Sequence, residues 1–417
     1  MDFCLMDLFT PLSPAMHRQL DELISLIDKV FPLPRRFRSG LPRDVAELSR
    51  LFTSGRSDRS LSYLGKPNLL SAYLRYFLPW NVYRLCRLLP SLPLDLKDGD
   101  AIIDLGSGPL TLVLALWLCC PSLRPLTLEF ICVDRTASVL NAGEKIFSAL
   151  ALGVKNTWKI RTIRGELAGR GIRLSRNHED GFFHPDKITH GKPVALVSAI
   201  NVFNEIYGEI SLWEKSSWEE TPVHQGLKNL TEKSARLLSS CCGEGAVLVL
   251  EPGIPRSGEF ISSLRASLLE QGLEPVSPCV HTHVCPFPGG LDSNKGKAKW
   301  CHFSFNTDDA PLELHRLSTA AAIPKERAVL SFLLAKKNTA PEEKPLSKKE
   351  LFCKTRVISD PFPVGTLYGR YGCSDRGLVL VRGARAELEA MESGTLAELR
   401  ITEKRDPKSG ALIGELL

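Results

Sequence analysis

The chain lacks any apolar run long enough to cross a membrane. The run from Leu110 to Cys120 ends at Pro121, whereas a membrane-spanning helix needs about 20 apolar residues. The first residues include Asp2 and Asp7 but no early Arg or Lys. A signal peptide needs a basic start and a transit peptide is Arg-rich and poor in acids, so neither is indicated. We therefore expect a soluble cytoplasmic protein with no membrane partner.

A secreted disulfide scaffold is also excluded, although the chain has twelve cysteines among 417 residues. Such scaffolds are short and follow a signal peptide. We expect reduced thiols, some of them candidate metal ligands. The neighbouring pairs Cys119–Cys120 and Cys241–Cys242 lie in or just after apolar segments. A free cysteine packs there as a small hydrophobic residue.

The net charge of +6 is unevenly distributed. From Arg35 to Arg87 the chain has ten Arg, one Lys and three acids, a local balance of +8, so the remainder sums to −2. This segment predicts a phosphate-bearing partner such as rRNA. The alternative is a solvated helical face.

Apolar spacing predicts four helices near the N-terminus, at residues 16–30, around 45–51, at 69–77 and at 82–89, the last two split by Pro79. We interpret residues 1–95 as a helical basic domain. Residues 96–335 then alternate between strands and helices, which predicts a parallel α/β sheet covered on both faces. Predicted strands are 101–105, 126–133, 158–163, 194–200, 246–250, 300–305 and 328–335, and predicted helices are 110–120, 137–150, 225–239 and 258–271.

The C-terminal part changes character after residue 335. Residues 336–349 are charged and contain proline, which is typical of a linker. Residues 350–417 contain short β-type runs with glycine between them and predict a small β module.

A glycine-rich turn follows the first predicted strand, in the sequence A-I-I-D-L-G-S-G-P that starts at Ala101. Glycine lets the backbone adopt positive φ and approach a ligand closely. The dinucleotide pattern G-x-G-x-x-G is incomplete, because position 111 is Thr111. The D-x-G-x-G form instead resembles the first motif of class I methyltransferases. The predicted ligand is S-adenosylmethionine (SAM), and the loop residues expected to bind it are Asp104, Gly106, Ser107 and Gly108.

Two further acids are candidates for the same cofactor. Asp134 ends the second predicted strand, where a carboxylate accepts the ribose hydroxyls. Glu166 follows the third predicted strand and is a candidate for the adenine end, with a solvated loop acid as the alternative. A purely structural turn that holds no cofactor is the alternative for the loop as a whole.

The fourth predicted strand leads into Asn201, Asn204 and Glu205, at the position that faces the transferred methyl group in this fold. The N-P-P-Y or D-P-P-Y sequence of amino methyltransferases is missing there. The nucleophilic Cys that a cytosine-C5 enzyme needs is missing too. These three residues are therefore the catalytic candidates, and the alternative is that they only cap the next helix.

Four cysteines form a second candidate site: Cys279, Cys285, Cys301 and Cys373. Four thiolates would complete a tetrahedral set for zinc or hold an iron–sulfur cluster. The C-x5-C spacing is wider than in common zinc sites, and His281, His283 and His302 offer zinc other ligands. Unrelated reduced thiols are the remaining alternative.

The chain resembles the methyltransferase-like family of mitochondrial small-ribosomal-subunit assembly proteins and their bacterial relatives. The resembling elements extend over roughly residues 35–385. They are Ala72-Tyr73-Leu74 with Leu78-Pro79, the 104–109 loop, Glu251-Pro252-Gly253 with Arg256, the Cys279/Cys285 pair, Trp300-Cys301-His302-Phe303-Ser304, and Cys373. The departures are a long Lys-rich segment between Cys285 and Cys301 and two extra histidines before Cys285.

The resemblance implies a class I methyltransferase fold, SAM binding, and a 4Fe-4S cluster on Cys279, Cys285, Cys301 and Cys373. It also implies association with small-subunit rRNA during assembly. The resulting prediction is a ribosome assembly factor, and an active SAM-dependent rRNA methyltransferase is the alternative. Radical SAM chemistry is excluded because the C-x3-C-x2-C motif is missing. Nothing in the sequence indicates the oligomeric state.

Overall fold

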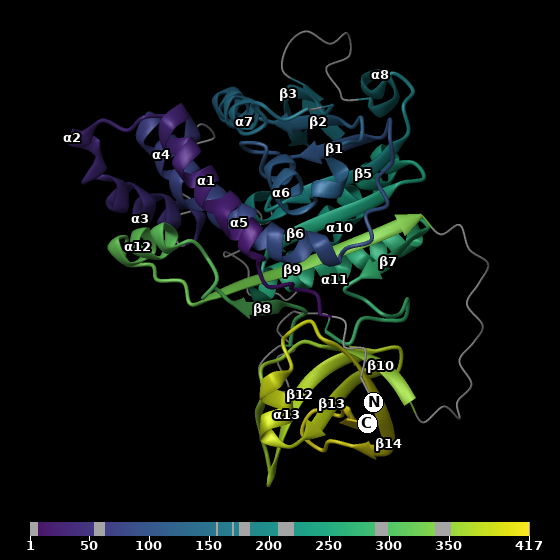
Figure 1. The fold of residues 1–417 in the computed structure, drawn as a ribbon. Coiled ribbons are helices and arrows are strands. Elements are labelled where there is room, and N and C mark those ends of the chain that lie inside the picture. The colour runs from purple at the N-terminus through teal and green to yellow at the C-terminus, as the bar shows by residue number, and fades with distance from the viewer. Residues whose placement is uncertain are drawn as a thin grey trace.

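A central sheet separates a set of N-terminal helices from a C-terminal barrel (Figure 1). The computed structural model describes residues 7–53, 63–155, 157–168, 171–174, 184–206, 221–287, 299–337 and 352–416. No helix within these ranges combines the length and apolar character that a membrane span requires.

The sheet has nine strands in the order β4-β3-β2-β1-β5-β6-β9-β7, with β8 paired to β9. Neighbours among β3, β2, β1, β5 and β6 are parallel, whereas β9 is antiparallel to both β6 and β7. A reversed strand in the next-to-last position is the arrangement of the class I methyltransferase sheet, so the predicted fold class is confirmed. The strands are β1 Ala101–Leu105, β2 Glu129–Asp134, β3 Lys159–Ala168, β4 Gly171–Leu174, β5 Val194–Ile200, β6 Ala246–Pro252, β7 Leu273–Ser277, β8 Phe303–Asn306 and β9 Arg327–Lys337.

Sequence periodicity missed two strands of this sheet and misplaced the end of a third. β4 and β7 are short and carry Gly, Pro and charged residues, so they lack the apolar runs that mark the buried strands. β3 continues to Ala168, which places Glu166 inside a strand rather than in a loop. Lys336 and Lys337, assigned to the linker, belong to β9, and the rest of that segment lies outside the described residues.

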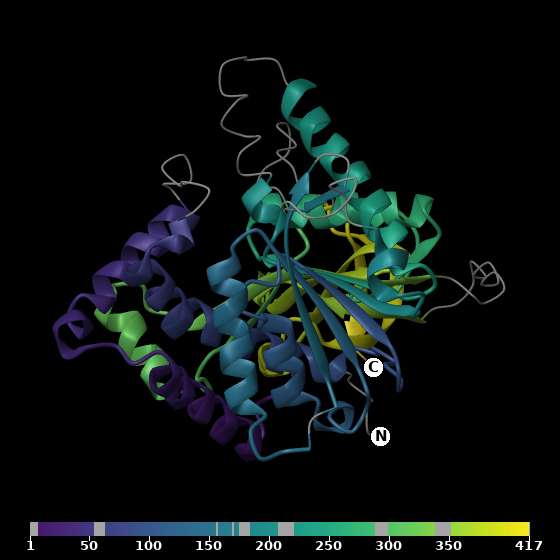
Figure 2. The ribbon, with the colours of Figure 1, turned by 90° about the horizontal axis from the view of Figure 1, so that it is seen from above.

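Helices cover both faces of the sheet. One face packs against α6 (Thr111–Cys119) and α7 (Ala137–Leu150), and the other against α10 (Thr221–Cys242) and α11 (Pro255–Glu270). α8 (Pro185–Thr189) adds Ile188 to the second core. All nine residues of α6 are buried. A helix that is apolar on every side needs a second cover, which the N-terminal helices provide (Figure 2).

The N-terminal helices share one continuous core with the sheet. The break expected at Pro79 is absent. η3 is a π-helical segment that runs directly into α5, and Pro79 lies in the first turn of α5, where its missing N–H costs least. These elements are α1 Pro14–Val30, α2 Arg35–Arg38, α3 Leu41–Phe52, η2 Tyr63–Gly65, α4 Pro67–Ala72, η3 Tyr73–Phe77, α5 Leu78–Leu88 and η4 Leu89–Ser91.

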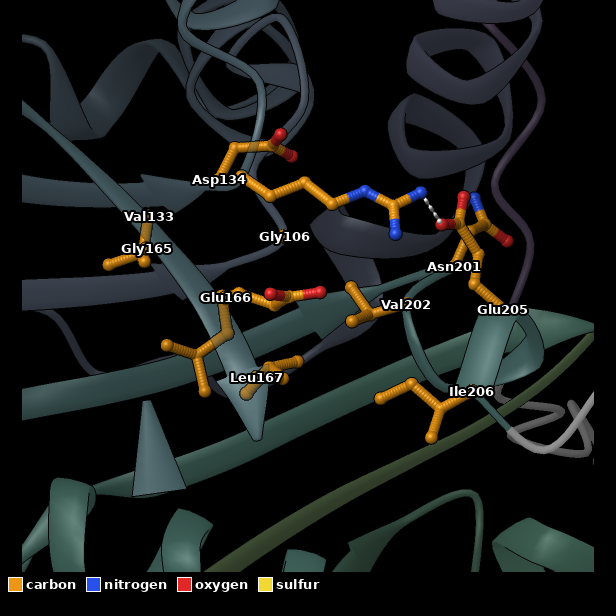
Figure 3. A pocket seen from close by; sticks show the side chains of 12 residues that line it. Gly106, Val133, Asp134, Gly165, Glu166, Leu167, Asn201, Val202, Glu205 and Ile206 are labelled. Atoms are coloured by element: carbon orange, nitrogen blue, oxygen red, sulfur yellow. Dashed lines mark hydrogen bonds and ion pairs between the residues drawn. The ribbon is translucent and has the colours of Figure 1, made fainter. Parts of the chain in front are cut away.

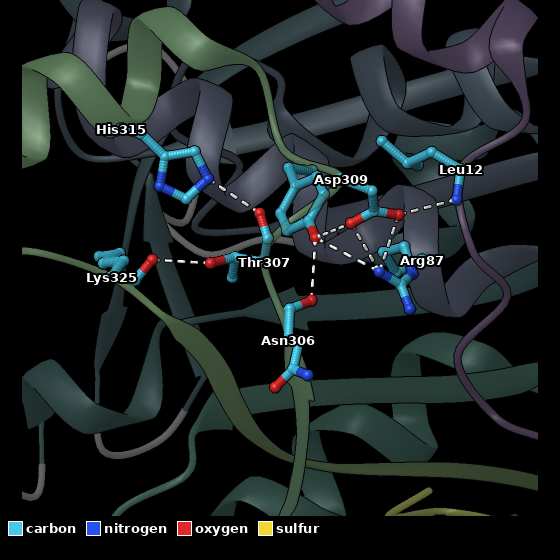
Figure 4. A network of polar contacts seen from close by, with 8 residues as sticks. Leu12, Arg87, Asn306, Thr307, Asp309, His315 and Lys325 are labelled. Carbon is cyan, nitrogen blue, oxygen red and sulfur yellow. Dashed lines mark hydrogen bonds and ion pairs between the residues drawn. The ribbon is translucent and has the colours of Figure 1, made fainter. Parts of the chain in front are cut away.

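A buried ion pair ties α5 to the turn after β8 (Figure 4). Arg87 Nη1 contacts both carboxylate oxygens of Asp309, at 2.8 and 2.9 Å. The same carboxylate accepts the Leu12 backbone N–H at 3.0 Å and the Tyr83 hydroxyl. The next helix, α12 (Leu312–Ala320), packs beside α3. These contacts position α5 firmly against the methyltransferase-type sheet.

The C-terminal module is a small barrel, as predicted. Its strands follow the order β10-β14-β15-β13-β12-β11, and β10 also pairs with β12, which closes the barrel. β13 and β15 are parallel. This order, with α13 (Arg385–Ala390) between β13 and β14, is that of an OB barrel. The strands are β10 Phe352–Val357, β11 Phe362–Val364, β12 Leu367–Ser374, β13 Gly377–Gly383, β14 Leu396–Arg405 and β15 Leu412–Leu416.

Polar contacts hold the barrel to the rest of the molecule. Arg356 of β10 donates to the Pro278 carbonyl at 3.2 Å. Arg327 of β9 pairs with Asp360 at 2.6 Å. The barrel face that carries Cys373 and Tyr371 packs into the same core as the sheet.

Candidate functional site

The predicted nucleotide loop is a tight turn from β1 into α6. Gly106 and Gly108 have φ values of +63° and +55°, in the left-handed region that favours glycine. A Cβ at Gly106 would lie 2.4 Å from Val202 Cγ2, so the residue after β5 approaches this glycine closely. The loop is therefore built for close approach both by the chain itself and by a ligand at the carboxyl ends of the strands.

Two acids hold this loop in place. Asp104 is fully buried and accepts the Ser198 hydroxyl at 2.6 Å, and burial raises its pKa to about 6. Asp134 accepts the backbone N–H of Gly108 at 3.0 Å and that of Thr136 at 2.8 Å. Burial also raises the pKa of Asp134. Asp134 is thus part of the loop framework as well as a cofactor candidate.

An open cavity lies at this edge of the sheet (Figure 3). Its empty volume, open solvent included, is about 800 Å³. Gly106, Asp134 and Glu166, three of the residues predicted to contact a cofactor, line it. Asp104, Ser107 and Gly108 are not among its lining residues. Ser107 is buried, and its backbone N–H donates to the Val133 carbonyl at 3.0 Å, so these three residues shape the loop behind the cavity.

The catalytic candidates separate into two groups. Asn201 and Glu205 line the cavity, and Asn201 has a positive φ of 57°. Glu205 pairs with Arg135 at 3.0 Å. The backbone N–H of Asn204 instead donates to Glu251 of β6 at 3.0 Å. Of the three candidates, Asn201 and Glu205 are therefore the ones in position to meet a ligand.

Glu251 caps the helical turn that begins at Phe203. Its two oxygens accept the backbone N–H groups of Phe203 and Asn204, at 2.8 and 3.0 Å. Burial raises its pKa to about 7. Asn201, Asn204 and Glu205 had been the alternative candidates for capping this helical turn. The cap instead comes from Glu251 on the neighbouring strand β6. The only sequence signal for it was the Glu251-Pro252-Gly253 turn of the resembling family.

Sequence reasoning missed the contribution of the N-terminal helices to this cavity. Arg84 Nη2 contacts Asn201 Oδ1 at 3.4 Å and Asn81 Oδ1 at 2.5 Å. The Tyr73 hydroxyl lies beside Gly108, and burial, with the charges of Glu205 and Asp134, raises its pKa. In the sequence, Tyr73 was noted only as part of the Ala72-Tyr73-Leu74 element of the family resemblance. Arg84 was counted only as one of the charges in the basic segment.

The fold brings the four predicted cysteine ligands together. Cys279 and Cys285 follow β7, Cys301 precedes β8, and Cys373 comes from β12 of the barrel. Every pair among the four interacts electrostatically. Burial raises the pKa of Cys279 to about 11, and burial with the other thiolates raises that of Cys301 and Cys373.

Two arginines and a histidine surround the four thiols. Arg265 and Arg356 are both buried and act electrostatically on Cys279 and Cys373. His281 Nε2 lies 3.1 Å from Cys373 Sγ, and burial lowers the pKa of His281 to about 4. As placed here, no group of three or more His, Cys, Asp or Glu side chains in the described ranges is arranged to hold a metal ion.

The basic segment from Arg35 to Arg87 does not form one uniform surface. Arg75 and Arg87 are buried, and a buried cation needs a partner. They form ion pairs with Asp28 and Asp309 respectively. Arg84 lies between α5 and the cavity. The remaining described arginines are exposed on α2 and α3, and these are Arg35, Arg36, Arg38, Arg43 and Arg50. Arg56 and Arg59 lie outside the described residues.

The sheet order and the glycine turn together define a methyltransferase-type domain. Residues 224–365 match the model of the family described as Mitochondrial small ribosomal subunit Rsm22. The resemblance predicted from the sequence is thereby confirmed, and the matched region contains Cys279, Cys285 and Cys301.

The solved structures that the chain is similar to include methyltransferases. One is a putative class I SAM-dependent methyltransferase from Listeria monocytogenes, 12% identical, covering 79% of this chain and 91% of its own, with a TM-score of 0.36. Another is geranyl diphosphate C-methyltransferase from Streptomyces coelicolor A3(2), 10% identical, covering 79% and 100%, with a TM-score of 0.30. Likeness at this level carries no argument about activity. No curated protein matches the chain.

Proposed function

We propose that the protein is a small-ribosomal-subunit assembly factor that binds SAM and rRNA and holds a 4Fe-4S cluster. The observation that carries the proposal is that four cysteines lie close together, three from the segment between β7 and β8 and one from the barrel. Three lie in the region that matches the Rsm22 family, and the barrel brings Cys373 to them. A cytoplasmic location belongs to the same proposal and is tested by cell fractionation.

SAM is assigned to the cavity at the carboxyl ends of β1, β2 and β3. All three line the cavity: Gly106 would allow close approach, Asp134 would accept the ribose hydroxyls, and Glu166 would contact the adenine end. The carboxylate of Asp134 already accepts two backbone N–H groups, and each carboxylate oxygen has a second lone pair for a hydroxyl. The site is thus preorganised for a ligand with vicinal hydroxyls.

A set of four thiolates suits either zinc or a 4Fe-4S cluster, and the family resemblance favours the cluster. Zinc in a thiolate site has Zn–S bonds of about 2.3 Å, so its four sulfurs must lie very close together. The four thiols interact electrostatically as a group, and the described residues are not arranged to hold a metal ion of either kind. A four-iron cluster is larger and spaces its cysteines further apart. Cys279, Cys285, Cys301 and Cys373 would hold it, and the chemistry it would supply is one-electron transfer or structural cross-linking.

Charge balance supports the same assignment. A 4Fe-4S cluster with four thiolates carries excess negative charge, which is costly to bury without compensation. Arg265 and Arg356 are buried beside the thiols and supply two positive charges. Their positions are also fixed by backbone carbonyls, with Arg265 donating to His281 O at 2.6 Å and Arg356 to Pro278 O at 3.2 Å.

The second candidate function is SAM-dependent methylation of rRNA. It is favoured by Asn201 and Glu205, which line the SAM cavity at the end of β5. It is opposed by the missing N-P-P-Y sequence and by the ion pair that already engages Glu205 with Arg135.

The deciding experiment is anaerobic purification followed by iron and sulfide analysis and sequencing of the bound RNA. We expect about four iron and four sulfide per chain, together with small-subunit rRNA. Incubation with radiolabelled SAM then separates the two functions, because only the alternative predicts label in that RNA. Protein with neither iron nor rRNA would contradict the assembly-factor proposal.

A further inference from the structure

We propose that an open cavity between α5 and the start of β9 binds a phosphate group, and that this phosphate belongs to an RNA strand. The second clause rests on the proposed function and the first does not. The cavity has an empty volume of about 820 Å³ and is lined by Trp80, Arg84, Lys325 and Arg327, among others. Of these four side chains, only Arg84 also contacts a residue of the SAM cavity, and none belongs to the cysteine site.

Two buried N–H donors in this cavity have no acceptor. Trp80 is 2% exposed, and its Nε1 has no hydrogen-bond partner. The Nε of Arg84 is also buried without a partner. A buried donor left unsatisfied costs about 1–3 kcal/mol. Native proteins rarely retain such groups unless a ligand, ion or water completes them. Both residues line one cavity, and we infer that a bound anion with several acceptor oxygens would complete their donors.

The ammonium group of Lys325 lies in the same place. Its Nζ is 5.2 Å from the centre of the Trp80 ring and 5.4 Å from that of Tyr76. The carbonyl of Lys325 accepts the Thr307 hydroxyl at 2.7 Å, which anchors the backbone below the side chain (Figure 4). No carboxylate in the described ranges forms an ion pair with Lys325.

Asp360 neutralises Arg327, but the acids near the cavity leave Arg84 and Lys325 without an ion pair within the described residues. Glu326 is exposed. Glu251 acts on Arg84 electrostatically, but both of its oxygens accept backbone N–H groups. Burial and the charge of Arg84 lower the pKa of Lys325 to about 7. A tetrahedral anion with several acceptor oxygens would complete this donor set and restore the lysine charge.

The position of the cavity indicates where a nucleotide would lie. Arg84 lines it and also reaches Asn201, which lines the SAM cavity. The guanidinium group therefore separates the two cavities. A strand whose phosphate sits beside Arg84 and Lys325 would bring an adjacent nucleoside to the Asn201 end of the SAM cavity.

The first test uses inorganic phosphate as the probe, titrated calorimetrically into the full-length protein at constant ionic strength. Lys325→Met removes the charge but keeps the apolar contacts with the rings. We expect the phosphate Kd to rise roughly tenfold in Lys325→Met, the loss of one charge-assisted hydrogen bond. Lys354→Met, on the exposed face of β10, should leave it unchanged. Wild-type protein that binds no phosphate at 50 mM, or an unchanged Kd in Lys325→Met, would overturn the site.

The second test uses a small-subunit rRNA transcript. Losing one phosphate contact should reduce the slope of log affinity against log salt by about 0.7–0.9. In Lys325→Met the phosphate Kd could rise while the slope of RNA affinity against salt stays unchanged. That result would support the phosphate site but overturn the RNA assignment in favour of a free phosphate compound.

If the wild-type protein binds no RNA, the proposed function fails while the phosphate titration still decides the site. A SAM affinity that falls with phosphate affinity in Lys325→Met would show that the cavity serves the SAM carboxylate, which overturns the proposal.

Discussion

Arg84 of α5 contacts Asn201 at the end of β5, with 3.4 Å between Nη2 and Oδ1, so a residue of the N-terminal helices reaches the methyltransferase-type cavity. The same helix is fixed by the Arg87–Asp309 ion pair one turn later. The N-terminal helices therefore contact the site through one of its lining residues. Their removal would expose the buried face of α6 and would free Asn201 from Arg84.

The Arg87–Asp309 pair should be important for stability. The two side chains are 5% and 26% exposed, and removing one partner leaves a largely buried charge. We expect Asp309→Ala to lower the free energy of unfolding by roughly 2–4 kcal/mol, measured by urea denaturation. Glu313→Ala breaks the exposed pair with Arg316, and it should cost about 0.5 kcal/mol or less. Similar losses for the two variants would contradict this reading.

SAM affinity should depend on Asp134 without a loss of fold. Asp134→Asn removes the charge and keeps one of the two oxygens that accept loop N–H groups, and we expect affinity to fall about tenfold by calorimetry. Gly106→Val is a poor test, because a Cβ there already meets Val202 within the protein. Glu403→Gln in the barrel is the matched control. Wild-type protein without SAM binding at millimolar ligand would refute the assignment.

The sequence predicted the sheet well because its buried strands are continuous apolar runs. The turn at Gly106 and the acid at Asp134 lie where the strand pattern placed them. The cap by Glu251 and the contact of Arg84 with Asn201 could not be predicted. Both depend on neighbours 48 and 117 residues away in the chain, a pairing that only the fold decides. The uniform basic surface was overestimated for the same reason, since acids distant in the chain neutralise Arg75 and Arg87.

Stability should depend on pH through Glu251. Burial raises its pKa to about 7, above the ordinary value of about 4.3. The folded state therefore keeps a proton that the unfolded chain releases, so this stability is full below about pH 4.3 and is lost as the pH rises through 7. We expect the stability of wild type relative to Glu251→Gln to fall by up to about 3 kcal/mol between pH 4.5 and 7.5. A difference that stays constant with pH would disprove the shift, and Glu398→Gln, an exposed acid, should show none.

The exposed arginines of α2 should contribute to RNA affinity through phosphates. Replacing Arg35, Arg36 and Arg38 with Ala should weaken rRNA binding and reduce the salt slope by about 2–3. A control triple variant at Lys145, Lys155 and Arg236 removes the same charge from other exposed positions. Equal effects of the two variants would mean that only net charge matters, whereas no effect of the first would make α2 a solvated surface.

The cluster assignment predicts that replacing Cys373 removes the cluster, whereas replacing Cys353 of the same barrel does not. Cys373 and Cys353 are both buried in the barrel, but only Cys373 lies among the four thiols, whereas Cys353 Sγ lies 3.3 Å from the Thr355 hydroxyl. Bound metal stabilises only the folded state, so a cluster held by all four thiolates would link the barrel to the sheet. We expect Cys373→Ser to lose iron, sulfide and the brown absorbance, and to increase protease cleavage between residues 338 and 351. Cys353→Ser should retain all three properties, and SAM affinity should be unchanged in both variants. Colourless wild-type protein with one zinc and no sulfide would replace the cluster by zinc, and equal iron in the two variants would remove Cys373 from the ligand set.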